Sequence, residues 1–119
     1  MSSRQMDPQR TLETEVPDYG DLSVPWEARL IQPLRYAKGS AQVLVVSVSA
    51  PIVLDHPVSI SVGGRYEPAT WQGSPSQRRT ATVILGDSLA PSGLATVRVK
   101  VHAGLEAPVL RAGTIKVTR

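Results

Sequence analysis

Apolar and polar residues alternate with a period of two along much of the chain, which is typical of β-strands that bury one face. The alternation is clearest in ATVRVKVHAG, residues 95–104, where Ala95, Val97, Val99 and Val101 are separated by polar or basic side chains. No segment with a helical period separates the strand-like segments that follow one another after residue 40. The pattern therefore predicts an all-β protein.

Five further strands are predicted from the same alternation. They cover Gln42–Ser49, Val58–Val62, Ala69–Gln72, Arg78–Leu85 and Val109–Thr118. The stretches between them, including GGR, GSPS, GDSLAPSG and AGLEAP, carry the glycine, proline and serine residues that favour turns. Within the last strand, Ala112–Gly113 interrupts the alternation, and we expect a kink or bulge there.

The alternation also assigns faces to the strands. Expected core positions are Leu44, Val46, Val48, Val58, Ile60, Val62, Ala81, Val83 and Leu85. Val43 and Val45 are apolar as well, which predicts that the start of this strand is covered on both faces. Ser59 and Ser61 are expected to point outward.

Residues 1–40 have a different character. Pro8, Pro17, Pro25 and Pro33 exclude a long helix, because each ring removes a backbone donor and clashes with the preceding turn. We interpret this part as an extended arm, with a short strand near Ala28–Ile31 or Leu34–Tyr36. Spaced apolar residues suggest that the arm lies along a surface, its own or a neighbour's. The expected partner-binding anchors are Leu12, Val16, Tyr19, Leu22, Trp26 and Leu30.

These elements define a fold class and a domain organisation. Residues 41–119 are predicted to form an antiparallel immunoglobulin-like β-sandwich of six strands, or seven with one from the arm. Residues 1–40 are the extended N-terminal arm of that domain. A small closed barrel is the alternative architecture.

Composition and charge narrow the function classes. The chain of 119 residues has no cysteine, which excludes disulfides, thiolate nucleophiles and cysteine-ligated metals. Its net charge of +3 divides into −1 for residues 1–40 and +4 for residues 41–119. The mildly basic charge of residues 41–119 favours a partner with an acidic surface. It is far below the density of Lys and Arg expected of a protein that binds nucleic acid specifically. We expect no membrane segment, because no apolar run approaches about 20 residues, and no secretory signal.

Candidate catalytic and metal-binding residues are few. Asp55 and His56 are adjacent, so in an extended chain they point to opposite sides and do not form a dyad. His102 has no second ligand at zinc-binding spacing. The acidic residues after position 40 are Asp55, Glu67, Asp87 and Glu106, each in or beside a turn. We therefore expect no enzyme, no cofactor and no metal.

Other side chains suggest contacts rather than chemistry. Arg98, Lys100 and His102 form an outward row that is either a solvated face or a contact with an acidic neighbour. Trp71 suits core packing better than a sugar-stacking platform. Trp26 either anchors the arm in a partner's pocket or caps its own domain. The pair Arg78–Arg79 is weak support for a phosphate contact.

One resemblance concerns residues 40–119. The order AQVLVVSVSA, VSISV, ATWQG and RRTATVILG, closing with LATVRVKVHAGLEAPVLRAGTIKVTR, resembles small immunoglobulin-like sandwich proteins encoded among the virion genes of tailed phages and prophages of actinobacteria. The likeness lies in the strand order and in the final hairpin, and it contains no catalytic motif. The resemblance implies a structural role in the virion.

Together these observations predict a phage virion structural protein, most simply a head decoration or minor capsid component anchored by its arm. The expected partners are other virion proteins, such as the major capsid protein or connector and tail proteins, in a symmetric multi-copy assembly. The expected location is the virion, assembled in the host cytoplasm. A head–tail connector or tail-fibre adaptor is the alternative position. A carbohydrate-binding module for cell-surface attachment is the alternative of another class, and it requires exposed Trp71, Trp26 or Tyr66.

Overall fold

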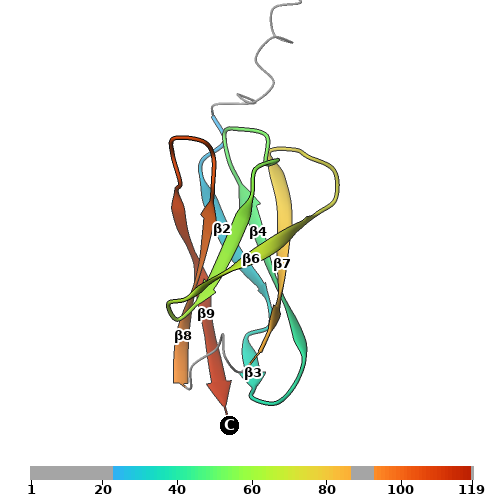
Figure 1. Ribbon diagram of the computed structural model, residues 1–119, viewed down its shortest axis with the longest axis vertical. Helices are drawn as coiled ribbons and strands as arrows, with labels where there is room; N and C mark the ends of the chain where they lie inside the picture. The colour runs from blue at the N-terminus through green and yellow to red at the C-terminus, as the bar shows by residue number, and fades with distance from the viewer. Residues whose placement is uncertain (1–22, 87–92, 119) are drawn as a thin grey trace, which may run out of the picture.

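The protein is all-β. The computed structural model describes residues 23–86 and 93–118, and these residues form eight strands and no helix (Figure 1). The strands are β2 (Glu27–Gln32), β3 (Arg35–Ala37), β4 (Gln42–Ser49), β5 (Val58–Val62), β6 (Tyr66–Gln72), β7 (Arg78–Leu85), β8 (Gly93–Val101) and β9 (Val109–Thr118). Alternation therefore identified the secondary-structure class correctly.

The eight strands form one curled sheet in the order β2-β4-β7-β6-β5-β8-β9-β3. All neighbours pair antiparallel except β3 and β9, which run parallel, with Tyr36 opposite Val117. The two edge strands, β2 and β3, follow one another in the sequence. The curl of the sheet brings the inner faces of both halves onto a single core.

Four strands have the bounds that the sequence predicts, namely β4, β5, β7 and β9. β6 begins at Tyr66 rather than Ala69. β8 covers Gly93–Val101, so it begins and ends earlier than the expected segment, residues 95–104. The expected bulge is confirmed. Val97 pairs with Gly113 and Arg98 with Arg111, so Ala112 has no partner on β8.

The core consists of the alternating apolar residues. Leu44, Ile60, Val97 and Val99 are fully buried, and most of the other expected core positions lie in the same cluster. Burial of such side chains is the main favourable term for a domain without disulfides.

One expectation about strand faces is wrong. Val43 is 46% exposed and Val45 is partly exposed, because β4 and β7 have no second layer over their outer face in the described residues. Ser61 lies on the outward side of β5 as expected, opposite Arg98 on β8, but it is buried there. Its hydroxyl accepts a hydrogen bond from the backbone N–H of Gly64 at 3.0 Å, which satisfies this polar group at the turn after β5.

Residues 27–37 are part of the sheet rather than an extended arm. β2 pairs with β4, and β3 pairs with β9, so both candidate strands before residue 40 form and the described strands number eight instead of six or seven. Tyr36 is 1% exposed, and its hydroxyl donates to the carbonyl oxygen of Ser40 at 2.9 Å. The predicted boundary near residue 40 is therefore not a boundary of the sheet.

Candidate functional site

A basic surface covers the outside of three neighbouring strands. We call this surface the basic face. It consists of the basic side chains that point outward from β3, β8 and β9, namely Arg35, Arg98, Lys100, Arg111 and Lys116. Alternation places these side chains outside, because their neighbours Tyr36, Val97, Val99 and Val117 are buried. The bulge at Ala112 keeps Arg111 on the same side as Arg98.

Like charges lie opposite one another on this surface. Arg98 pairs with Arg111 across β8 and β9, and Arg35 pairs with Lys116 across β3 and β9. Directly opposed like charges cost a few tenths to about 1 kcal/mol per pair. Strands β3, β5, β8 and β9 contain no Asp or Glu, so no acidic side chain within these strands offsets the repulsion. The basic face has the electrostatic character of a surface that accepts an anion.

The three residues singled out by the sequence, Arg98, Lys100 and His102, lie along one side of β8 and just beyond its end. The ammonium of Lys100 lies 5.7 Å from the centre of the Tyr66 ring, and His102 Nε2 is 3.1 Å from the Ser59 hydroxyl. Sequence reasoning missed the contributions of Arg35, Arg111 and Lys116. The outward positions of the last strand were the available signal for two of them.

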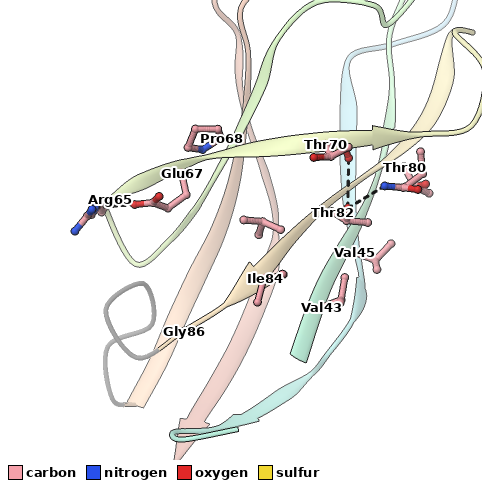
Figure 2. Close-up of a pocket in the computed structure, with 12 residues that line it drawn as sticks. Val43, Val45, Arg65, Glu67, Pro68, Thr70, Thr80, Thr82, Ile84 and Gly86 are labelled. Carbon is pink, nitrogen blue, oxygen red and sulfur yellow. Dashed lines mark hydrogen bonds and ion pairs between the residues drawn. The ribbon is translucent and has the colours of Figure 1, made fainter. Parts of the chain in front are cut away.

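A groove lies on the opposite half of the sheet. It has a volume of about 890 Å³ and lies between β6 and the outer faces of β4 and β7 (Figure 2). Its lining is mainly uncharged and contains no aromatic side chain: Val43, Val45, Arg65, Glu67, Pro68, Thr70, Gln72, Thr80, Thr82, Val83, Ile84 and Gly86. The two charged residues form an ion pair with each other at 2.8 Å.

The groove exists because β6 and β7 diverge. They pair only from Thr70 to Gln72 on β6 and from Thr80 to Thr82 on β7. Beyond this point β7 pairs only with β4, and β6 pairs only with β5. Ile84, 70% exposed, lies where the two strands have separated. The groove therefore offers a small apolar and hydroxyl-bearing surface without a net charge.

The candidate residues around the loops have structural partners. The indole N–H of Trp71 donates to the carbonyl oxygen of His56 at 2.6 Å, and Trp71 packs against the core. Arg79 donates to the carbonyl oxygens of Leu54 and Gly73, each at 2.6 Å. These contacts use Arg79 to hold two loops together, which favours a structural interpretation over a phosphate contact. Arg78 is exposed beside it.

The arm anchors divide into two groups. Trp26 and Leu30 are partly buried against the core of their own chain. For Trp26 this arrangement corresponds to the hypothesis that it caps its own domain. The other four anchors, Leu12, Val16, Tyr19 and Leu22, lie outside the described residues.

Metal and membrane signals are absent from the described part of the chain. Residues 23–86 and 93–118 contain no cluster of three His, Asp or Glu side chains placed to hold a metal ion. The same residues contain no helix of the length and apolar character that spanning a bilayer requires. Comparison of the sequence with protein-family models and with curated proteins finds no match to either.

Proposed function

We propose that this protein is a non-catalytic structural component of a phage virion, in the first place a head decoration or minor capsid protein. The observation that carries the proposal is the basic face, where five cationic side chains lie on three strands without a carboxylate among them. Retaining two like-charged pairs, Arg98–Arg111 and Arg35–Lys116, is costly for an isolated domain and is offset when an acidic partner covers them.

We also propose that the curled sheet is an immunoglobulin-like sandwich. β6 supports this because its first half pairs with β5 and its second half with β7. On this view β2, β4 and β7 form one layer, and β5, β8, β9 and β3 form the other. A rigid sandwich with one shared core is suited to presenting its two outer faces to different neighbours.

The proposed partners are other virion proteins, in a symmetric assembly of many copies. The apolar anchors Leu12, Val16, Tyr19 and Leu22 precede the first described strand and are available in the sequence for such contacts. A position at the head–tail connector or in a tail-fibre adaptor uses the same surfaces. Virion assembly in the host cytoplasm is the corresponding location.

A carbohydrate-binding role receives less support. The groove has no aromatic lining, and Trp71 is engaged by His56 and Arg79. Trp26 packs against the core. No aromatic platform of the kind that sugar rings stack on therefore lies in the groove.

Particle incorporation tests the proposal. A chain that starts at Ser23 retains every described strand, whereas removal of residues 1–40 deletes β2 and β3. We expect the chain without residues 1–22 to fold, with an unchanged β-type circular dichroism spectrum, and to be missing from purified particles. A chain with Arg29→Glu, on the exposed side of β2, is the control that should still be incorporated. Normal incorporation of the truncated chain would contradict the proposed anchoring role.

A further inference from the structure

Charge is distributed unevenly between the first residues and the sheet. Residues 1–22 contain two arginines and five carboxylates, whereas residues 23–119 contain eleven basic and five acidic side chains. The N-terminal segment thus has a formal charge of −3 and the remainder +6. Opposite net charges on two parts of a chain favour contact between them.

The acidic segment and the basic face also match in pattern. The carboxylates of this segment are interspersed with its apolar anchors, in the order Leu12, Glu13, Glu15, Val16, Asp18, Tyr19 and Asp21. Two exposed apolar residues lie among the side chains of the basic face: Leu94, 78% exposed, is opposite Lys116, and Val109, 49% exposed, is opposite Lys100. In an extended chain Glu13, Glu15 and Tyr19 lie on one side, which offers both carboxylates and an aromatic ring to the face.

We propose that the basic face binds the acidic N-terminal segment, residues 7–21, of a second copy of this chain. The segment of fifteen residues spans up to about 50 Å when extended. A ten-residue strand such as β9 spans roughly 33 Å, so the segment is long enough to leave its own sheet and cover the face of a neighbour. This contact would give the protein of the proposed function one specific partner. It rests on that function only for the presence of many copies of the chain in one assembly.

The geometry of such a contact determines the assembly. The segment and the face are different surfaces, so two copies can exchange segments in a closed dimer, or each copy can give its segment to one neighbour and accept a segment from another. Contacts of this head-to-tail type generate a closed ring or an open filament. Because exposed charges carry much of the contact, self-association should weaken as the Debye length falls from about 10 Å at 0.1 M salt to about 3 Å at 1 M.

A charge-exchange experiment tests the pairing with the full chain. One variant cancels the charge of the segment: Glu13→Lys with Glu15→Lys takes residues 7–21 from −4 to 0. A second removes most of the charge of the face: Arg98→Glu with Arg111→Glu takes its five side chains from +5 to +1. In sedimentation velocity at about 0.1 M salt, we expect the unaltered chain to self-associate. Each variant should associate about tenfold more weakly by itself. An equal mixture of the two variants should recover association, because the unaltered acidic segment of the second variant then meets the unaltered basic face of the first.

A matched control separates location from net charge. Arg29→Glu with Arg78→Glu makes the same change in charge on β2 and β7, away from the basic face, and should associate like the unaltered chain. Equal weakening in this control would overturn the proposal, as would a mixture that stays monomeric. A chain that is monomeric at all concentrations and more compact at low salt would assign the segment to its own face and also overturn it.

Two further outcomes would assign the basic face to another partner or separate this inference from the proposed function. Salt-dependent binding of duplex DNA by a chain that does not self-associate would assign the face to nucleic acid and reject a second copy. If self-association is absent but truncation of residues 1–22 still abolishes particle incorporation, the further inference fails and the proposed function stands. The two claims are therefore distinguishable.

Discussion

The guanidinium carbon of Arg79 lies 5.2 Å from the centre of the Trp71 ring, over one face of the indole. Both side chains also hold loop carbonyls. Arg79 binds those of Leu54 and Gly73, and Trp71 binds that of His56. The pair therefore connects the loops before β5 and after β6 to the core.

Replacing Arg79 should destabilise the fold. Arg79→Ala removes two charge-assisted hydrogen bonds, one of them to the buried residue Leu54. We expect the free energy of unfolding to fall by about 2 kcal/mol, as measured by urea denaturation. The neighbouring Arg78 is exposed, so Arg78→Ala should change this free energy by less than about 0.5 kcal/mol. Equal effects of the two substitutions would show that the contacts of Arg79 contribute little.

Tryptophan emission should not respond to glycans. The chain has two tryptophans; Trp71 is covered by Arg79, and Trp26 packs against the core. Titration with soluble glycans, followed by intrinsic fluorescence, should leave intensity and emission maximum unchanged. Saturable quenching by one glycan, with no quenching by an unrelated sugar, would support the carbohydrate-binding alternative instead.

Gly113 should not accept a side chain without cost. A Cβ at this position would lie 3.0 Å from Leu30 Cβ, and Leu30 belongs to the edge strand β2. Gly113→Ala must therefore push β2 away from β9, and we expect a loss of about 1–3 kcal/mol in thermal or chemical denaturation. Gly86 has open space around it, so Gly86→Ala is the control. No difference between these variants would mean that β2 yields freely at this contact.

The uncharged groove should not contribute to self-association. Ile84 is 70% exposed, and threonine keeps its β-branched shape. We expect Ile84→Thr to change the free energy of unfolding by less than about 0.5 kcal/mol and to leave the sedimentation profile of the full chain unchanged. Weaker association of this variant would move the interface from the basic face to the groove.

The alternation of apolar and polar residues predicted those features of the fold that depend on residues close together in the sequence. The bounds of β4, β5, β7 and β9 follow from alternation between turn residues, and the bulge at Ala112 follows from its interruption. The strands before residue 40 were harder, because proline residues break the alternation there. β3 is held by parallel pairing with β9, near the other end of the chain, and nothing in the sequence around Tyr36 indicates that partner.

The same distinction applies to the candidate site. Alternation placed Arg98 and Lys100 on the outside of β8. The full basic face required the register of three strands, which brings Arg111 opposite Arg98 and Arg35 opposite Lys116. The groove depends on where β6 and β7 stop pairing, and alternation does not indicate that point.

Cross-linking of mixed isotopic chains shows directly whether the basic face of one copy contacts the N-terminal segment of another. Lys100 and Lys116 are two of the three lysines in the chain, and both lie on the basic face. A carbodiimide joins a lysine amine to a carboxylate that is in contact with it, without adding a spacer. The full chain is cross-linked as an equal mixture of unlabelled and nitrogen-15-labelled protein, digested, and analysed by mass spectrometry.

We expect cross-links from Lys100 or Lys116 to Glu13, Glu15 or Asp18, in peptides that combine one unlabelled and one labelled chain. Salt at about 1 M should reduce their yield, because it screens the contact. Cross-links confined to peptides of a single isotope would show that the segment does not bind a second copy, and links from these two lysines that never reach residues 7–21 would show that it does not bind the basic face.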